Sequence, residues 1–561
     1  MSTPIPRVSD STLDVSEQNS VNFKIPSRSR VGAPVIPFCH DNATKLFGPP
    51  GAGKTRTLVE WLREDVDAGE LKLSESIICS FTKTAAQDIA RRVNRDRKPG
   101  RYHTTLHAVA KRYHSLDWPL AEPHLGEFFG SIGVEYQQGR ADPDLWVDTG
   151  TAEGNLLIAY WGRCRNRLQT PVEGLDYEDA PFDLIQLWDP KVMDGLWRQY
   201  EEWKESEGYI DFTDMLEIAA ESPPAGIQWS LFVLDEAQDC TPLQWKVAQG
   251  FASASECCYL SGDDDQCLYS FTAARPDELL AADVPEDILR INHRSGRAIV
   301  EMAETFIQRN QNRRQKDMTS ARGGGEIDDT YYLPELNVEE STFVMARAHY
   351  LMSEWINELT DRAFPFYDRR KASGVNGVAA VAYRRFRALS HGKRIPLEDW
   401  SKLARSAIPS RGPWLVRGSK DWLRKTDEHT LMRTYVRVDD IEQWGATTEL
   451  ANTIRANSIE PLAQLNQDRL GYLCRVADRW GEEYLDEAKA ASVCQVGPIH
   501  QFKGLEADHV VLHSGLSPAA TRDALSDIEA ERRVIYVALT RARARITNVI
   551  GRAASQWRDV L

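Results

Sequence analysis

The sequence lacks the marks of secreted, membrane-spanning and disulfide-stabilised proteins. No apolar run approaches the roughly 20 residues that a membrane-spanning helix needs. The N-terminus has no basic segment followed by an apolar one, as a secretion signal would have. The nine cysteines include no CxxC pair, and the adjacent Cys257 and Cys258 suit neither a disulfide nor a zinc site. We therefore expect a protein of a reducing cytoplasm, bacterial or of a viral host, without structural zinc or an iron–sulfur cluster.

Basic residues are too few to balance the acidic ones. The net charge is −15, which taken alone opposes binding to a polyanion such as a nucleic acid. The basic residues are clustered, however. Asp96 is the only acidic residue between positions 89 and 114, and Glu398 and Asp399 are the only ones between 369 and 420. These two basic stretches keep nucleic-acid binding open.

The length and the apolar pattern predict several α/β domains. A chain of 561 residues is long enough for about three or four domains. Residues 1–40 are polar and contain Pro and Ser, so we expect a flexible tail. Apolar runs at 45–47, 76–81, 229–237 and 257–265 alternate with helical patterns. This alternation predicts a doubly wound α/β sheet, which binds ligands at the carboxyl ends of its strands.

Two helical segments interrupt the α/β pattern. The first is acidic and rich in Trp, and the second separates two parts of a further α/β unit. We therefore predict a first unit at 41–114 and 205–285 with an insertion at 115–204, and a second unit at 286–365 and 490–561 with an insertion at 366–489.

The segment GPPGAGKT, residues 48–55, fits the phosphate-loop pattern G-x-x-x-x-G-K-[ST]. In such a loop, backbone N–H groups wrap phosphate oxygens, the lysine reaches the β- and γ-phosphates and the hydroxyl ligates Mg²⁺. The strand before it and the helix after it favour this interpretation over an unrelated Gly/Pro loop. The predicted ATP contacts are Gly48, Gly51, Ala52, Gly53, Lys54 and Thr55.

The segment VLDEAQD places two carboxylates at the end of an apolar run. Asp235 suits Mg²⁺ ligation, and Glu236 suits the base that activates an attacking water. The alternative is a solvated acidic turn.

The segment GDDDQCLYSF offers Gln266, a neutral group that can contact both a phosphate and a water. The rings of Tyr269 and Phe271 suit stacking on bases, worth about 1–3 kcal/mol each. The alternative is that both rings belong to the core.

Two arginines of the second unit, Arg294 in NHRS and Arg541 in YVALTRA, are candidates for stabilising charge on a transferring phosphoryl group. Contacts of this kind would couple hydrolysis to domain closure. In HQFKGLE, Glu506 is a candidate acceptor for a ribose hydroxyl.

The basic stretch 89–114 mixes arginines with Tyr102, His103, His107 and Tyr113, which fits a groove that follows a nucleic-acid strand. The alternative is a solvated basic helix. In the stretch 369–420 we expect Arg384 and Arg385 to contact duplex DNA. The alternative there is that the basic residues meet an acidic face of the same protein.

Taken in order, these segments resemble superfamily 1 helicases, specifically the UvrD/PcrA/Rep-like branch. The distinguishing signs are GDDDQ-x-x-Y-x-F, HxxKGLE, YVALTRA and the segment IDFTDML at 210–216. The resemblance implies an α/β fold with two RecA-like P-loop motor domains, parallel sheets flanked by helices, each with an inserted, mainly helical accessory domain. It also implies ATP and Mg²⁺ between the motors and single-stranded DNA across both.

The resemblance assigns roles residue by residue. It implies phosphate and metal machinery made of Lys54, Thr55, Asp235, Glu236, Gln266, Arg294 and Arg541. It implies nucleotide contacts by Arg56, His293 and Glu506, and contacts with the DNA strand by Phe81, His107, Tyr269 and Phe271.

Four departures from the family pattern stand out. The stretch before the phosphate loop contains no Gln that would read the adenine edge, His293 replaces a stacking Tyr, and Phe271 stands where Trp is common. As the fourth departure, we expect no nuclease domain after the last motor segment. The first departure leaves strict preference for ATP open.

We expect an ATP-dependent, 3′-to-5′ single-stranded DNA translocase and DNA helicase of repair or replication. It would act on single strands and single-strand/duplex junctions, without a membrane partner and with an unidentified loading protein. One alternative is a DNA-sensing regulatory ATPase subunit of a repair or defence complex. Another is a motor directed to RNA.

Overall fold

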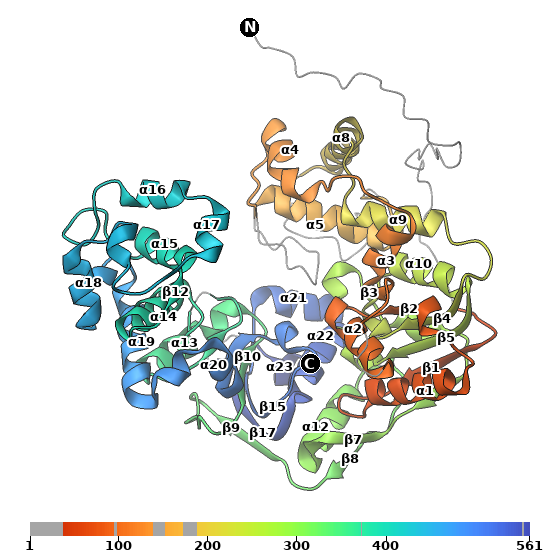
Figure 1. The fold of residues 1–561 in the computed structure, drawn as a ribbon. Helices are drawn as coiled ribbons and strands as arrows, with labels where there is room; N and C mark the ends of the chain where they lie inside the picture. The colour runs from red at the N-terminus through yellow and green to blue at the C-terminus, as the bar shows by residue number, and fades with distance from the viewer. Residues whose placement is uncertain (1–37, 95–97, 139–151, 172–187, 372, 552–554) are drawn as a thin grey trace, which may run out of the picture.

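The computed structural model describes residues 38–94, 98–138, 152–171, 188–371, 373–551 and 555–561. The tail expected at 1–40 lies almost wholly outside these residues. The described part of the chain contains two six-stranded sheets, each with helices on both faces (Figure 1). This arrangement confirms the predicted α/β class. No described helix combines the length and apolarity needed to cross a membrane.

The first sheet has the strand order β3-β2-β4-β5-β1-β6, and all its pairings are parallel. Its strands are β1 (Ala43–Phe47), β2 (Ser76–Cys79), β3 (His103–Thr104), β4 (Trp229–Leu234), β5 (Ser255–Gly262) and β6 (Glu286–Ile288). The apolar runs at 45–47, 76–81, 229–237 and 257–265 thus all contain strands of one sheet.

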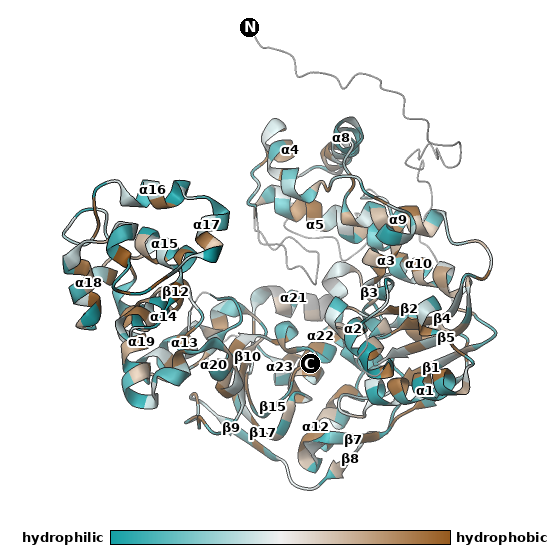
Figure 2. Ribbon diagram, in the orientation of Figure 1, coloured by the Kyte–Doolittle hydropathy of each residue, from teal (hydrophilic) through white to brown (hydrophobic). Residues whose placement is uncertain are grey.

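Alternation of side chains along these strands builds two separate cores. Ile77 and Cys79 pack on one face of the sheet with α3 (Leu106–Tyr113), α9 (Phe212–Glu221) and α10 (Pro242–Ala252). Ile78 points to the other face, toward α1 (Lys54–Ala68) and α2 (Lys83–Val93). The inner strands β2 and β4 are accordingly apolar on both sides, and brown predominates along the inner part of this sheet in Figure 2.

The second sheet has the order β11-β14-β10-β15-β17-β9 and is also parallel throughout. Its strands are β9 (Glu326–Thr330), β10 (Thr342–Ala346), β11 (Tyr367–Asp368), β14 (Cys494–Pro498), β15 (Ala507–His513) and β17 (Ala542–Val549). One face packs against α12 (Arg297–Ile307) and α22 (Ile528–Leu539). The other packs against α13 (Ser353–Asp361) and α20 (Glu487–Val493).

Both interruptions of the α/β pattern are mainly helical. The first contains α4 (Leu125–Ser131), α5 (Glu153–Asn166) and α8 (Pro190–Glu207), which share a core of aromatic side chains. The helices of the second are α14 (Val378–Ser390), α15 (Leu397–Ser406), α16 (Ser419–Lys425), α17 (Glu428–Arg433), α18 (Thr448–Arg455) and α19 (Gln467–Trp480). Figure 1 shows the first group above the first sheet and the second group beside the second sheet.

The sheets end at slightly different residues from those expected. β6 pairs with β1, so the first sheet reaches Ile288 rather than residue 285. The next strand, β7 (Ile291–Gly296), pairs with β8 (Thr319–Arg322) in a separate two-stranded sheet. β11 lies within the range predicted for the second insertion but is the edge strand of the second sheet. Short edge strands have little apolar pattern of their own, which is why the sequence did not reveal them.

Candidate nucleotide and nucleic-acid site

The phosphate loop connects the end of β1 to the start of α1. Gly53 caps α1 with a backbone φ of 89°, and Gly51 has a φ of 75°, both in the left-handed region that favours glycine. The Lys54 ammonium donates a hydrogen bond to the carbonyl oxygen of Gly48 at 2.7 Å. This bond places the lysine across the loop, at the N-terminal end of α1 where anions bind.

The neighbouring predicted residues occupy different environments. Ala52 is buried, and Thr55 is half-buried in the first turn of α1. Arg56 is exposed and pairs with Glu60, one turn further along α1, at 2.8 Å. Thr55 is therefore beside the loop, whereas Arg56 faces solvent.

Asp235 follows β4 at the edge of the sheet where the phosphate loop also lies. It is buried, and its N–H donates to the carbonyl of Cys79 at 2.9 Å. Within the described residues, its Oδ1 accepts no hydrogen bond. Burial and the adjacent Glu236 raise the pKa of Asp235 to about 7. A buried carboxylate oxygen without a donor is a suitable ligand for a divalent cation.

Glu236 has a left-handed backbone, with a φ of 56°. Its Oε2 accepts a hydrogen bond from Nε2 of Gln238 at 2.6 Å and lies 4.0 Å from Nζ of Lys503. Burial acts to raise the pKa of Glu236, but Lys503 and Lys54 outweigh it, and the pKa is lowered. Glu236 is thus an ionised carboxylate at neutral pH, as a general base must be.

The NHRS segment in β7 packs directly on the phosphate loop. Nδ2 of Asn292 donates to the carbonyl of Pro50 at 2.6 Å, and the N–H of His293 donates to the carbonyl of Gly51 at 2.9 Å. A Cβ added to Gly51 would lie 2.6 Å from Cβ of Arg294, so only glycine fits there. The His293 side chain is exposed.

Arg294 and Glu506 form an ion pair. Arg294 also donates to the carbonyl of Thr540 at 3.3 Å, and burial lowers its pKa. The other oxygen of Glu506 accepts from Arg543 at 2.7 Å. Both carboxylate oxygens of Glu506 are therefore engaged, and a ribose hydroxyl would have to share them.

Gln266 and Arg541 meet across the two α/β units. Nη2 of Arg541 donates to Oε1 of Gln266 at 2.9 Å, and the Gln266 amide donates from Nε2 to Asp263 at 2.8 Å. Burial and the nearby Arg294 lower the pKa of Arg541 to about 9. Lys503 joins the same group, because its Nζ donates to the carbonyl of Gln266 at 2.9 Å and pairs with Asp239.

The aromatic residues predicted to contact a strand lie next to this cleft. Phe81 and Tyr269 are stacked, with ring centroids 4.6 Å apart and planes 3° apart. Nζ of Lys503 lies 5.3 Å from the centre of the Tyr269 ring. Phe271 is in η5 (Ser270–Thr272), and its side chain lies outside the described residues.

A pocket connects Phe81 of this aromatic pair with the carboxylates. Phe81, His107, Asp235 and Glu236 all line it, together with residues of α5 such as Asn166. His107 is half-buried, and burial lowers its pKa to about 4. The ring is therefore neutral at pH 7, and it can stack but adds no positive charge.

The structure does not bring Arg384 and Arg385 to the cleft. Both lie on α14, where Arg384 pairs with Glu487 at 2.5 Å and Arg385 with Asp399 at 2.6 Å. Arg387, on the same helix, pairs with Glu482. These contacts match the alternative in which the basic stretch meets acidic residues of the same protein.

The segment IDFTDML anchors the first insertion to α9. Asp211 and Asp214 form a capping box at the start of α9. The buried ammonium of Lys204 contacts Asp211 at 3.0 Å and Asp214 at 2.7 Å, and Arg165 contacts Asp211 at 2.6 Å. The two aspartates are buried because two cations from the insertion neutralise them.

Sequence reasoning missed three residues of the site. Lys503 lies in the segment HQFKGLE and Asn292 in the segment NHRS, so the motifs themselves could have pointed to both residues. Lys316 had no such signal, because it lies outside every motif. Its ammonium group contacts the three aspartates of the GDDDQ segment.

Two family models match the chain. An AAA domain matches residues 34–272, and a UvrD-like helicase C-terminal domain matches residues 417–550. Together they include the phosphate loop, both carboxylates, Gln266, Glu506 and Arg541.

Several bacterial proteins are similar to the chain. YjcD of Bacillus subtilis is 25% identical over 326 residues, which are 53% of this chain and 40% of YjcD. The ATP-dependent DNA helicase PcrA of Leuconostoc citreum is 24% identical over 327 residues, 54% of this chain and 42% of PcrA. The ATP-dependent DNA helicase UvrD2 of Mycobacterium tuberculosis is 22% identical over 585 residues, 92% of this chain and 77% of UvrD2. The chain thus spans less than half the length of the first two relatives. By its motifs, fold and matched models, it belongs to the UvrD-like superfamily 1 helicases.

Proposed function

We propose that this protein is an ATP-dependent translocase on single-stranded DNA and a DNA helicase. The observation that supports this most is the hydrogen bond between Arg541 and Gln266, because it joins the two motor units beside the phosphate loop. A nucleotide bound there would contact both units, so its hydrolysis would change how they sit relative to each other.

The proposed ATP site is built mainly from the phosphate loop. Backbone N–H groups of residues 48–53 and the Lys54 ammonium would hold the phosphates. His293 is fixed to the loop through its backbone N–H, and its exposed ring would stack on the base. Arg56 and Glu506 are further proposed nucleotide contacts.

Mg²⁺ fits the donors that are present. Asp235 offers a buried carboxylate oxygen that accepts no hydrogen bond from the described residues, and the Thr55 hydroxyl follows the loop lysine. When bound, the ion would neutralise charge on the β- and γ-phosphates. A bound cation would also keep Asp235 ionised although burial raises its pKa.

Hydrolysis would then use groups from both units. Glu236 would take a proton from the attacking water, and Gln266 would orient that water against the γ-phosphate. Arg294 and Arg541 would stabilise the charge that develops on the transferring group. Gln266 and Arg541 contact each other, Arg294 and Arg541 share the neighbour Thr540, and Glu236 and Gln266 share the neighbour Lys503.

The DNA strand is proposed to follow the aromatic pair Phe81 and Tyr269, with His107 and Phe271 alongside. Base stacking on such rings is tolerant of sequence, as translocation requires. Movement from 3′ to 5′ is proposed from family membership. Arg384 and Arg385 are proposed to reach duplex DNA at a junction through side chains that are about one quarter and one fifth exposed.

The first test is ATP hydrolysis with Mg²⁺, with and without single-stranded DNA, using Lys54→Ala as control. We expect strong stimulation by DNA that disappears in the variant. Stimulation by RNA alone would redirect the proposal to an RNA motor. Hydrolysis that survives Lys54→Ala would show that the site is wrongly placed.

Unwinding assays separate the helicase from a DNA-sensing regulatory ATPase. We expect a duplex with a 3′ single-stranded tail to be unwound and one with a 5′ tail to remain paired. ATP hydrolysis stimulated by DNA without displacement of either duplex would favour the sensor.

A further inference from the structure

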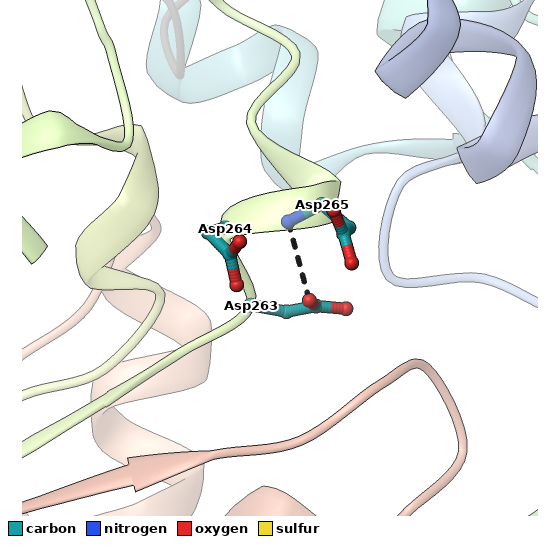
Figure 3. A group of neighbouring side chains, drawn as sticks. All are labelled: Asp263, Asp264 and Asp265. Carbon is teal, nitrogen blue, oxygen red and sulfur yellow. Dashed lines mark hydrogen bonds between the residues drawn. The ribbon is translucent and has the colours of Figure 1, made fainter. Parts of the chain in front are cut away.

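Three consecutive aspartates are fully buried at the end of β5. Asp263, Asp264 and Asp265 begin the turn that leads into Gln266, and their carboxylates lie within 4.8 Å of one another (Figure 3). Three carboxylates this close repel each other strongly unless a cation lies between them. A group of this kind commonly holds a metal ion.

A lysine side chain takes the place of that cation. Nζ of Lys316 lies 3.0 Å from Asp263, 2.6 Å from Asp264 and 2.7 Å from Asp265, and the side chain is 1% exposed. Arg313 adds a second positive charge, 2.7 Å from Asp265. The N–H of Arg314 donates to Asp264 at 2.7 Å. The centre of the acidic group is therefore filled by an ammonium.

These cations come from the other motor unit. They lie in the crossing segment, residues 308–318, which connects α12 to β8. The crossing segment is fixed to α22, because Asn310 donates to the carbonyl of Glu529 at 3.1 Å and Arg533 donates to the carbonyl of Asn312 at 2.6 Å. It thus connects α22 in the second unit to the aspartates in the first.

A continuous chain of contacts leads from Lys316 to Arg541, which follows the end of α22. Oδ1 of Asp263 lies 3.0 Å from Lys316, and Oδ2 of Asp263 accepts from Nε2 of Gln266 at 2.8 Å. Oε1 of the same amide accepts a hydrogen bond from Nη2 of Arg541. The orientation of the Gln266 amide therefore depends on Asp263, and the position of Asp263 depends on Lys316.

We propose that Lys316 is a positioning residue for ATP hydrolysis, an internal counter-ion from the second motor that holds Gln266 in register with Arg541. The inference rests on the proposed function, because it assumes that Gln266 and Arg541 act on the nucleotide. It assigns no metal to the three aspartates. Loss of the Lys316 charge would leave three buried carboxylates to repel one another, and Gln266 would lose its fixed acceptor.

The test is Lys316→Met in the full chain, measured as kcat and KM for ATP at saturating single-stranded DNA. We expect kcat to fall roughly ten- to a hundredfold, because small misplacement of a reacting group costs about that much, with KM little changed. Asp264→Asn added to Lys316→Met should restore part of kcat by removing one of the three negative charges. Thermal unfolding gives the folded fraction by which each rate is corrected.

Lys204→Met is the matched control. Lys204 is equally buried and also holds two aspartates, but in the first insertion. We expect it to lower the unfolding temperature while folded protein keeps its kcat. If Lys316→Met does not fold, Arg313→Met removes the outer positive charge and should lower kcat in the same direction by less.

The outcomes separate the two proposals. Wild-type protein that does not hydrolyse ATP overturns the proposed function and the role of Lys316 together. Wild-type hydrolysis with an unchanged kcat in folded Lys316→Met or Arg313→Met overturns the role of Lys316 alone. Equal losses of kcat in Lys316→Met and Lys204→Met would do the same, because they would reflect general destabilisation.

Discussion

Oε1 of Gln266 accepts a hydrogen bond from Nη2 of Arg541 at 2.9 Å, although the two residues are 275 positions apart in the chain. Both side chains are almost completely buried. Each motor unit thus supplies one half of a contact that neither can make alone. Residues that act through a shared contact have non-additive effects when both are changed.

Gln266→Ala and Arg541→Ala should each lower kcat for DNA-stimulated ATP hydrolysis by about 10- to 100-fold, since each removes a group aimed at the transferring phosphate. The double variant should lose little more than the worse single variant. A double-mutant cycle on kcat measures this. Arg198→Ala, an exposed arginine on α8, is the control. Fully additive losses would mean that the two residues act independently.

Tyr269→Ala should raise the concentration of single-stranded DNA needed for half-maximal stimulation by about 5- to 150-fold, which corresponds to about 1–3 kcal/mol of stacking. Tyr269 is only 6% exposed, stacks on Phe81 and lies beside Lys503, so its loss removes the ring that supports Phe81 next to the ATP site. A titration of ATPase rate with oligonucleotide checks it.

Tyr332→Ala serves as the comparison for Tyr269→Ala. Tyr332 is 76% exposed and follows β9, away from the aromatic pair. Its substitution should leave the DNA titration unchanged. If both variants shift the titration equally, the Phe81 and Tyr269 pair is not the strand contact.

The parts of the fold with strong local patterns were predictable from the sequence. The apolar runs at 76–81 and 229–237 are strands β2 and β4 because their side chains are buried on both faces of one sheet. The phosphate loop was predictable because its glycines adopt left-handed backbone angles that other residues avoid.

The features that could not be predicted from the sequence depend on contacts between distant segments. Lys316 carries no local sign of its role, because a lysine is normally exposed and only the fold brings three aspartates around it. Arg385 looked like a free positive charge because Asp399 stands fourteen positions away in sequence but 2.6 Å away in space. Charge counts along a chain do not reveal which charges pair.

The ion pair between Arg385 on α14 and Asp399 on α15 gives a sharp test of duplex contact. If Arg385 contacts duplex DNA, Asp399→Asn should free its charge and strengthen binding to a tailed duplex, whereas Arg385→Ala should weaken it. Binding measured at several salt concentrations would show a slope steeper by about 1 for Asp399→Asn. Loss of thermal stability in both variants, with unchanged DNA binding, would mean that the pair is only structural.

Glu122 should make the stability of the protein fall as pH rises through neutrality. Its Oε1 accepts from the N–H of Phe212 at 2.9 Å, while its Oε2 is buried and accepts no hydrogen bond within the described residues. Burial and the nearby Asp211 raise the pKa of Glu122 to about 7. The carboxyl group of an unfolded chain has a pKa of about 4.3.

These two pKa values determine how the stability changes with pH. Because the folded protein holds the Glu122 proton more tightly, this contribution to stability is complete below about pH 4.3 and is lost as pH rises through about 7. Glu122→Gln cannot ionise, so it should unfold at a higher temperature than wild type at pH 8, by roughly 1–3 kcal/mol in free energy of unfolding. The difference should shrink toward pH 5. Thermal unfolding across this range measures it, with Glu127→Gln, an exposed glutamate on α4, as control. A Glu122→Gln variant no more stable than wild type at pH 8 would mean that this carboxyl group is ionised at no cost in the folded protein.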